Sequence, residues 1–362
     1  MSGICTRLIV LTVTLLASGL AERAFSATAL PTQEPNCAPE NGLNFLCGPL
    51  NIEDMVTIPG HNALIGSSGR APDAPVGAPV GKLYFIDTKA RAFVQLVPDV
   101  TGMARQEYSA CPSAPDMSAF SPHGIGLRAG VHEQHLLYVV NHGGREAIEL
   151  FALDASRTPV SLTWVGCVVL PEGGFGNGVA PLADGGFVAT KFLDKRHGDM
   201  LSQFSIQEKT GAVYRWHPGQ GITELPGGDL SGNNGIETSA DGKWVFVNVW
   251  PEKRVVRFAL DGHAPISIPL DFMPDNIHRA PDGSLLIAGQ DTDIPTLWQH
   301  FSTNTPIDWV VVRLDPKTLR VSPLLREKGT SHFDNVSGAA QIGNVLWLGP
   351  VHGDRVASKS LP

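Results

Sequence analysis

Six short polar motifs recur along the chain, and their residue types could bind a metal ion. Carboxylate and amide oxygens suit hard cations, and calcium takes about six to eight of them. Zinc is disfavoured, because no cysteine and no cluster of histidines belongs to these motifs. The fold must bring the motifs together if they are to act as one site. Their opening residues are Glu53, His123, Asn177, Asn234, Asp275 and Asp334.

The segments that must position these residues form a degenerate repeat. Each motif precedes an expected strand, a turn and a strongly apolar strand, and the turn reads ADG, ADG or PDG in three of the units. Such turns are typical of β-hairpins. The units start about 56 residues apart on average, close to the length of a four-stranded propeller blade with its loops. Further strand candidates lie between them, at Gly81–Thr88, Ile148–Asp154, Gly211–Pro218, Arg254–Asp261 and Trp309–Pro316.

We therefore expect an all-β fold, a six-bladed β-propeller with a central metal-binding channel. Equivalent positions of the blades lie at the same distance from the axis, so the opening residues should form an oxygen-rich ring around the channel. The alternative is ordinary turn chemistry, since Asn, Asp and Gly begin many strands and loops. Five side chains would supply oxygens with a summed charge of −2, which matches one Ca²⁺: Glu53, Asn177, Asn234, Asp275 and Asn276.

The composition excludes several classes of protein. Of the 362 residues, 43% are hydrophobic and only 17% are charged, which excludes intrinsic disorder and suffices for one large domain or two ordinary ones. A formal net charge of −8 argues against binding along a nucleic-acid backbone, which requires a basic face. We therefore expect a small-molecule partner and no nucleic acid.

The N-terminal segment has the pattern of an export signal. Arg7 precedes the uncharged run Leu8–Ala21, whose fourteen residues are too few to span a bilayer comfortably. Small residues follow at Ala24 and Ser26, so we expect a signal peptide at 1–26, an N-terminal segment at 27–46 and a six-bladed β-propeller domain at 47–362. A retained N-terminal anchor is the alternative. No second run approaches membrane length, which predicts a secreted or periplasmic protein with no membrane span in its mature form.

Four cysteines follow the expected signal peptide, an even number that suits disulfides in an oxidising compartment. Four cysteines allow three pairings. We favour Cys37–Cys47, because these two residues bracket a short polar loop, and then Cys111–Cys167 by elimination. The sequence has no CxxC motif, so neither zinc binding nor dithiol redox chemistry is indicated.

The order and spacing of several motifs resemble the paraoxonase/arylesterase family and, more distantly, the gluconolactonase group that includes senescence marker protein 30. The resemblance covers residues 45–355. It implies a six-bladed propeller with calcium in its channel and hydrolysis of esters or lactones at the channel mouth. The motifs that carry it are Leu50–Met55, Ser121–Ile125, Leu137–His142 with Glu149–Phe151, Asn234–Ile236 and Asp275–Ile277.

The resemblance also implies roles for single residues. Asp54 and the backbone carbonyl of Ile125 match ligands of a deeper, structural calcium. His123 and His142 match a proposed histidine dyad. The ligands of the catalytic calcium match the same five residues as above, Glu53, Asn177, Asn234, Asp275 and Asn276.

Three departures from the family pattern bear on these implications. Gly178 stands where the family has an aspartate that serves the structural calcium, which leaves the second site with less charge. No cysteine follows Cys167, so the family's disulfide to the C-terminal end is missing and strand pairing must close the propeller. Lys191 replaces a polar residue that is typical of its strand.

The expected activity is calcium-dependent hydrolysis of lactones or aryl esters. Calcium would polarise the substrate carbonyl, and His123 would take a proton from the attacking water while His142 orients it or relays the proton. A carboxylate such as Glu53 or Asp275 is the rival base. A serine hydrolase is disfavoured, because the sequence has no G-x-S-x-G motif. The alternatives are a gluconolactonase-like sugar lactonase and a non-catalytic binding propeller with a structural calcium.

Substrate specificity should reside in loops over the channel mouth, including 191–207 and 290–305. These segments contain apolar side chains that could form an acyl pocket, although ordinary loop packing would use the same residues. The candidates are Phe192, Met200, Phe204 and Trp298.

Overall fold

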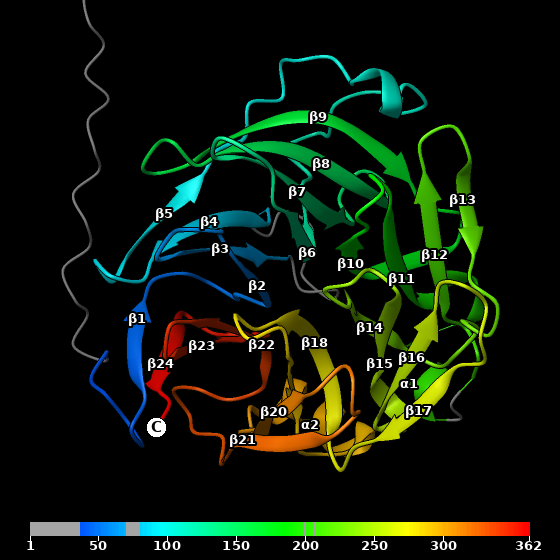
Figure 1. Cartoon of the computed structure of the whole chain (residues 1–362). Coiled ribbons are helices and arrows are strands. Elements are labelled where there is room, and N and C mark those ends of the chain that lie inside the picture. The colour runs from blue at the N-terminus through cyan, green and yellow to red at the C-terminus, as the bar shows by residue number, and fades with distance from the viewer. Residues whose placement is uncertain (1–36, 70–79, 199, 206–207) are drawn as a thin grey trace, which may run out of the picture. The chain divides into compact units, whose positions relative to one another are not determined.

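Six four-stranded antiparallel sheets lie around a central axis in the computed structural model, which describes residues 37–69, 80–198, 200–205 and 208–362 (Figure 1). This arrangement confirms the all-β, six-bladed propeller predicted from the repeat. The first three blades contain β2 (Asp54–Thr57), β3 (Ala63–Ser68), β4 (Lys82–Asp87), β5 (Ala92–Leu96), β6 (Pro122–Arg128), β7 (Gln134–Asn141), β8 (Ala147–Asp154), β9 (Ser161–Val169), β10 (Gly174–Pro181), β11 (Phe187–Asp194), β12 (Ala212–His217) and β13 (Gly221–Glu224).

The fourth and fifth blades continue the same order, and the sixth combines the two ends of the described chain. They contain β14 (Asn233–Thr238), β15 (Trp244–Val249), β16 (Arg254–Ala259), β17 (Ile266–Pro269), β18 (Met273–Arg279), β19 (Leu285–Gln290), β20 (Trp309–Leu314), β21 (Val321–Glu327), β22 (Val336–Ile342), β23 (Val345–Pro350), β24 (Arg355–Ser360) and β1 (Asn44–Cys47).

The hairpins explain why the repeat could be recognised. The ADG and PDG segments connect the first and second strands of blades three to five, and their glycines Gly185, Gly242 and Gly283 all have positive φ. Glycine adopts this conformation without a steric penalty. The strand candidates between the units form the third strands, as at β4 and β20.

Strand pairing closes the propeller, as predicted from the absence of a cysteine after Cys167. β1 pairs antiparallel with β24, with Phe45 opposite Ala357, and so becomes the outermost strand of the sixth blade. The Cys37–Cys47 disulfide ties the segment before β1 to the end of this strand. The propeller sheets therefore begin at Asn44, within the segment assigned above to 27–46.

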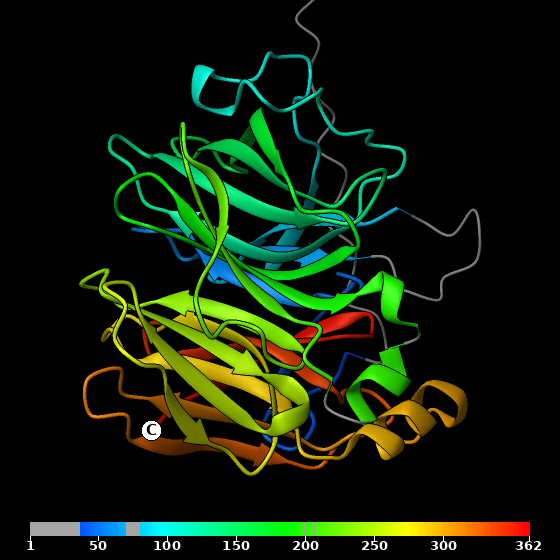
Figure 2. The same ribbon diagram turned by 90° about the vertical axis from the view of Figure 1, so that its right-hand side faces the viewer.

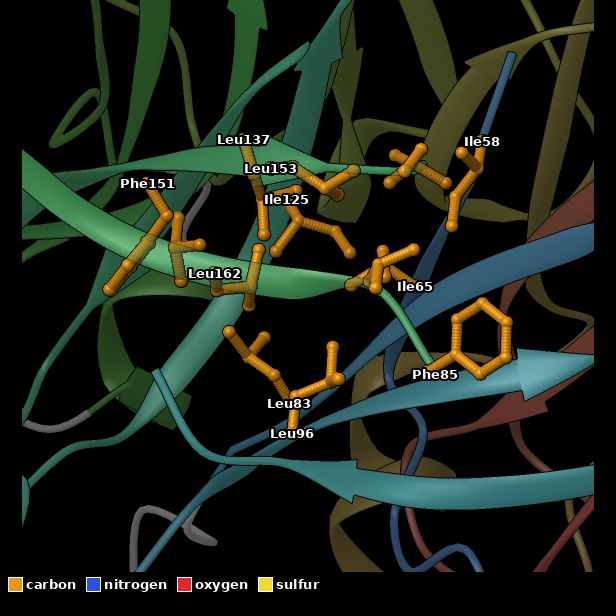
Figure 3. Packing of buried hydrophobic residues seen from close by; sticks show 14 of the residues in the cluster. Ile58, Ile65, Leu83, Phe85, Leu96, Ile125, Leu137, Phe151, Leu153 and Leu162 are labelled. Carbon is orange, nitrogen blue, oxygen red and sulfur yellow. The ribbon is translucent and has the colours of Figure 1, made fainter. Parts of the chain in front are cut away.

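Apolar layers between neighbouring blades hold the sheets together. Between the first two blades, Ile65 and Leu83 lie in one cluster with Ile125, Leu137 and Phe151 (Figure 3). Leu137 and Phe151 are fully buried. Complete burial of such a side chain contributes about 1.5–3 kcal/mol to the free energy of unfolding. These contacts fix the blades rigidly enough to position polar groups at the axis.

Helices interrupt two of the segments that were expected to be loops. They are α1 (Met200–Ser205) after β11 and α2 (Ile294–Thr303) after β19, and they lie close together at the face where the innermost strands begin (Figure 2). Asp293 caps α2 by accepting a hydrogen bond from the Thr296 amide. The short 3₁₀ helices are η1 (Gln106–Tyr108), η2 (Lys195–His197) and η3 (Trp250–Glu252).

Both predicted disulfides are present. Cys111 and Cys167 join the segment that contains η1 to strand β9, across a sequence separation of 56 residues. Two disulfides are compatible with an extracytoplasmic protein. The expected signal peptide at 1–26 lies outside the described residues. Within the ranges that the structure describes, no helix is long and apolar enough to cross a membrane.

Candidate functional site

The ring of polar residues arises from a bulge in the innermost strands. In β6, β10, β14 and β18, pairing with the second strand skips two residues, so the first of each skipped pair leaves the regular alternation. Bulges of this kind re-aim side chains and are common beside functional sites. The skipped pairs are His123–Gly124, Asn177–Gly178, Asn234–Gly235 and Asp275–Asn276.

The glycines of these pairs allow the innermost strands to approach one another. A Cβ atom on Gly124 would lie 2.1 Å from the carbonyl oxygen of Asn177, and one on Gly235 would lie 2.6 Å from that of Asp275. No side chain can be accommodated at such distances. The polar–Gly pairs, which resemble turn chemistry in the sequence, are therefore required by close packing around the axis.

The fifth blade has an asparagine where the preceding three have glycine. Its side chain reaches the first blade, where Asn276 Nδ2 donates to Glu53 Oε1 at 2.8 Å and to the Glu53 carbonyl oxygen at 3.0 Å. In the sixth blade the bulge falls at Ser337, whose hydroxyl donates to the same carbonyl at 2.7 Å. Asp334 was placed in the ring by its motif, but its carboxylate instead accepts a hydrogen bond from the Ile307 amide. Ser337 therefore takes the ring position assigned to Asp334.

Three of the five predicted calcium ligands have a buried oxygen without a donor. Glu53 Oε2, Asn177 Oδ1 and Asn234 Oδ1 have no hydrogen-bond partner among the described residues, although all three residues are buried. A buried acceptor without a partner costs about 1–3 kcal/mol. The ring thus presents oxygens that lack positive partners, which is the arrangement expected of cation ligands.

The electrostatics of the ring favour added positive charge. Burial and the nearby charge of Glu53 raise the pKa of Asp275. Burial lowers the pKa of His123, but the charge of Glu53, the hydrogen bond to it and the charge of Asp275 outweigh this effect and raise the pKa to about 9. His123 Nε2 lies 3.3 Å from Glu53 Oε1. A cation held by these carboxylates would oppose both shifts.

The donor set suits calcium better than a transition metal. Within the described ranges, no three His, Cys, Asp or Glu side chains are grouped so that they could hold a metal ion. The candidate ligands are two carboxylates and three amides, the chemistry preferred by calcium. Gln290 supports them, because its Nε2 donates to Asp275 Oδ2 at 2.8 Å while its Oε1 accepts from Trp250 Nε1 at 2.8 Å. The sequence analysis did not identify Gln290, which lies fifteen residues after Asp275.

The deeper position, expected to hold a structural calcium, is occupied by contacts within the chain. Asp54 accepts hydrogen bonds from the amides of Met55 and Ile125, each at 2.8 Å, and its Oδ1 lies 2.5 Å from His278 Nε2. Burial lowers the pKa of His278, but the charge of Asp54 and its hydrogen bond outweigh this and raise it. The chain itself thus supplies the positive charge beside Asp54, and this position does not fit a second cation.

A cavity of about 670 Å³ opens at the end of the channel opposite the oxygen-rich ring, where the innermost strands end. Thr57, Leu127 and Gln341 are among the residues that line it, and His278 borders it from the channel side. The Asp54–His278 pair therefore lies between this cavity and the ring of oxygens.

The structure brings the two predicted dyad histidines together. His123 Nδ1 and His142 Nε2 are 2.8 Å apart, and His142 Nδ1 is 2.8 Å from Glu146 Oε2. The His142 ring stacks on Phe175, with centroids 3.9 Å apart and an interplanar angle of 9°. Burial lowers the pKa of His142. Glu146 was not predicted from the sequence, in which its position four residues after His142 is the only local signal.

The expected acyl-pocket residues contribute to a packed cap beside the ring. Phe192 and Phe204 are buried against each other and against Trp250. Leu297 of α2 belongs to the same cluster. Trp298 is half-buried on the same helix, and the side chain of Met200 lies outside the described part of the structure. Phe192 and Phe204 are thus core residues of the cap.

These features define a class of protein, a six-bladed β-propeller with an oxygen-rich ring and a histidine pair at one end of its channel. The sequence matches the family model described as SMP-30/Gluconolactonase/LRE-like region over residues 72–299. This match covers more than half of the chain, and the chain therefore belongs to that family. No curated protein matches the sequence.

Solved structures show the same fold at low sequence identity. A gluconolactonase from Xanthomonas campestris is 17% identical with a TM-score of 0.52, and the match covers 88% of this chain and 89% of that one. Regucalcin from Agrobacterium tumefaciens, described as a calcium-binding protein, is 12% identical with a TM-score of 0.52, covering 88% and 92%. A luciferin-regenerating enzyme is 11% identical with a TM-score of 0.52, covering 87% and 94%.

Proposed function

We propose that the protein is an exported, calcium-dependent hydrolase of lactones or aryl esters, close in activity to the paraoxonase branch. The observation that carries this proposal is the set of unpaired, buried oxygens on Glu53, Asn177 and Asn234 beside a histidine pair. A purely structural metal site would need the oxygens but not the adjacent imidazoles. The family and the two disulfides support a lactone substrate and an oxidising compartment.

Five residues would hold the ion, and the remaining residues of the site support them. When bound, calcium supplies positive charge that favours an oxyanion on the substrate. Asn276 holds Glu53, and Gln290 holds Asp275, so both carboxylates are positioned before any ligand arrives. The ligands are Glu53, Asn177, Asn234, Asp275 and Asn276.

The histidine pair would move the proton. His123 lies at the ring with Nε2 toward Glu53, and its Nδ1 contacts His142. In this arrangement Nε2 of His123 accepts a proton from water. His142 orients the His123 imidazole through its contact with Nδ1 of His123. A carboxylate of the ring, Glu53 or Asp275, is the rival base. The Gln variant of His123 tests this assignment, because it should abolish hydrolysis without altering the fold, and activity at the wild-type level would refute it.

A gluconolactonase-like sugar lactonase is the second candidate, favoured by the family match. Hydrolysis of phenyl acetate, a δ-lactone, gluconolactone and an acyl-homoserine lactone, each with calcium and with EGTA, distinguishes the two. We expect calcium-dependent turnover that EGTA removes, and the ratio of rates identifies the substrate class. Folded, calcium-loaded protein that hydrolyses none of them would refute the proposal and favour a binding propeller.

A matched pair of variants tests the metal ligands. Asp275→Asn removes one of two ring charges and should weaken calcium binding by about tenfold or more, with activity falling in parallel. Asp261→Asn makes the same change in an exposed turn, where the carboxylate contacts the amide and the imidazole of His263. It should leave calcium affinity unchanged. Equal affinity for calcium in the two variants, measured by isothermal titration calorimetry, would refute the ring assignment.

A further inference from the structure

A continuous series of polar contacts leads from the exposed rim of the propeller to the histidine pair. Lys195 Nζ lies 2.5 Å from Glu146 Oε1, Glu146 Oε2 lies 2.8 Å from His142 Nδ1, and His142 Nε2 lies 2.8 Å from His123 Nδ1. Lys195 belongs to η2 in the third blade, and Glu146 lies between β7 and β8 in the second. The series therefore crosses from one blade to the next.

Both oxygens of Glu146 are engaged, and its side chain is only 16% exposed. Oε1 contacts Lys195, whereas Oε2 contacts His142 and also accepts a weak hydrogen bond of 3.4 Å from the Gly176 amide. Burial raises the pKa of Glu146, but the hydrogen bond from His142 and the contact with Lys195 outweigh it, so the pKa is lowered. The carboxyl group is therefore ionised and can only accept hydrogen bonds.

An ionised Glu146 determines which nitrogen of each imidazole carries a proton. His142 must donate to it from Nδ1, so in the neutral ring Nε2 bears the lone pair. His142 Nε2 then accepts from His123 Nδ1–H, which leaves Nε2 as the basic nitrogen of neutral His123. That atom faces Glu53 at the ring.

The orientation of His142 is fixed as well as its tautomer. Its ring stacks on Phe175, and Lys195 Nζ lies 4.9 Å from the centroid of the same phenyl ring. Lys195 thus contacts both groups that hold His142. A solvent-exposed ion pair would lack these restraints, as in the pair of His61 and Glu133, whose side chains are 33% and 49% exposed.

We propose that Glu146 is the positioning residue of the His123–His142 pair, and that Lys195 holds its carboxylate in place. Glu146 fixes the Nδ1–H tautomer of His142 and thereby directs the basic nitrogen of His123 into the ring. This inference rests on the proposed function, because the tautomer matters for hydrolysis only if the pair handles a proton there. The side-chain contacts of Glu146 are to His142, Lys195 and the Gly176 amide, so it acts on His123 through His142.

Glu146→Gln tests the proposal, since the amide keeps the shape of the side chain but removes its charge and can donate a hydrogen bond. We expect kcat on the best ester or lactone of the panel to fall about tenfold to a hundredfold, with KM changed less than about twofold. Glu133→Gln is the matched control, because it makes the same change in an exposed His–Glu pair remote from the ring. It should leave kcat unchanged. Equal kcat in Glu146→Gln and wild type would overturn the proposal.

A second measurement does not depend on turnover. Long-range ¹H–¹⁵N spectra of the calcium-loaded protein, labelled in histidine, should show His142 as the Nδ1–H tautomer. In Glu146→Gln that signature should shift toward the other tautomer, whereas Glu133→Gln should leave the His142 signature unchanged. An unchanged His142 signature in Glu146→Gln would overturn the inference even in an active enzyme. If the wild type hydrolyses no substrate, the proposed function fails, and the spectra alone decide whether Glu146 sets the tautomer.

Lys195→Met tests the outer end of the series. The Lys195 side chain is 49% exposed, so solvent partly replaces its charge, and we expect a smaller fall in kcat than in Glu146→Gln, less than about tenfold. A larger fall in Lys195→Met than in Glu146→Gln would contradict the proposed order of contacts. Thermal unfolding within about 2 °C of wild type in both variants shows that the losses do not come from unfolding.

Discussion

Replacing His278 by alanine should destabilise the propeller strongly, because it leaves a buried carboxylate without its positive partner. The Asp54 side chain is 2% exposed and that of His278 is 12% exposed, and they meet at 2.5 Å. The two amides that also bind Asp54 donate hydrogen bonds but carry no net charge. Removal of His278 therefore leaves one uncompensated negative charge close to the ring, which already contains Glu53.

The size of the expected loss in stability follows from the burial of the Asp54–His278 pair. Breaking a buried ion pair on one side costs about 3–5 kcal/mol. His278 borders the 670 Å³ cavity, so water can reach part of the vacated space, and the lower end of this range applies. We therefore expect a loss of about 3 kcal/mol in the free energy of unfolding, which lowers Tm by about 4 °C in a chain of this size.

The assay is calorimetric and chemical unfolding of the calcium-loaded protein at neutral pH. His61→Ala is the matched control, since it breaks the His61–Glu133 pair, which is equally short at 2.6 Å but exposed. Its cost should be at most about 1 kcal/mol. Adding Asp54→Asn to His278→Ala should recover part of the stability, because it removes the uncompensated charge. Equal losses in His278→Ala and His61→Ala would refute the reasoning.

Three further predictions follow from the same structure. The protein should bind one calcium ion per chain, because His278 serves Asp54, and two ions per chain in equilibrium dialysis would contradict this. Replacing Cys111 and Cys167 together by serine should cost about 2–4 kcal/mol, since the disulfide closes a separation of 56 residues, and calorimetry checks it. Hydrogen bonds from Arg196 lower the pKa of Asp194, so its stabilising contribution is present above the ordinary carboxyl pKa and is lost as the pH falls. Asp194→Asn should therefore lose less stability than wild type between pH 6 and pH 3, and parallel losses would refute this.

The sequence predicted the architecture well because the evidence for it is local. Hairpin turns and apolar strands recur within each blade, and the Gly of each polar–Gly pair marks the point where neighbouring strands touch. The same regularity led to the wrong placement of Asp334 in the ring, because its motif resembles that of Asp275. The bulge of the sixth blade contains one residue fewer, so the ring position falls at Ser337.

The contacts that support the site could not be predicted from spacing alone. His278 meets Asp54 across 224 residues, and Lys195 meets Glu146 across 49. Such pairs depend on which blade is adjacent and on the depth of each side chain in the channel. The α2 helix was missed because its ten residues begin within a segment that otherwise has the polar composition of a loop.

Because β1 pairs with β24, the propeller can close only after both of these strands have been synthesised. Residues 44–47 are synthesised long before the strand at 355–360 with which they pair. Until then the sixth sheet lacks its outermost strand, and the blade that supplies the contact of Ser337 with Glu53 is incomplete. A chain that lacks residues 355–360 therefore holds Glu53 beside an incomplete sixth blade. Cation affinity should consequently rise when both ends of the chain have met, which makes calcium binding a reporter of completed folding.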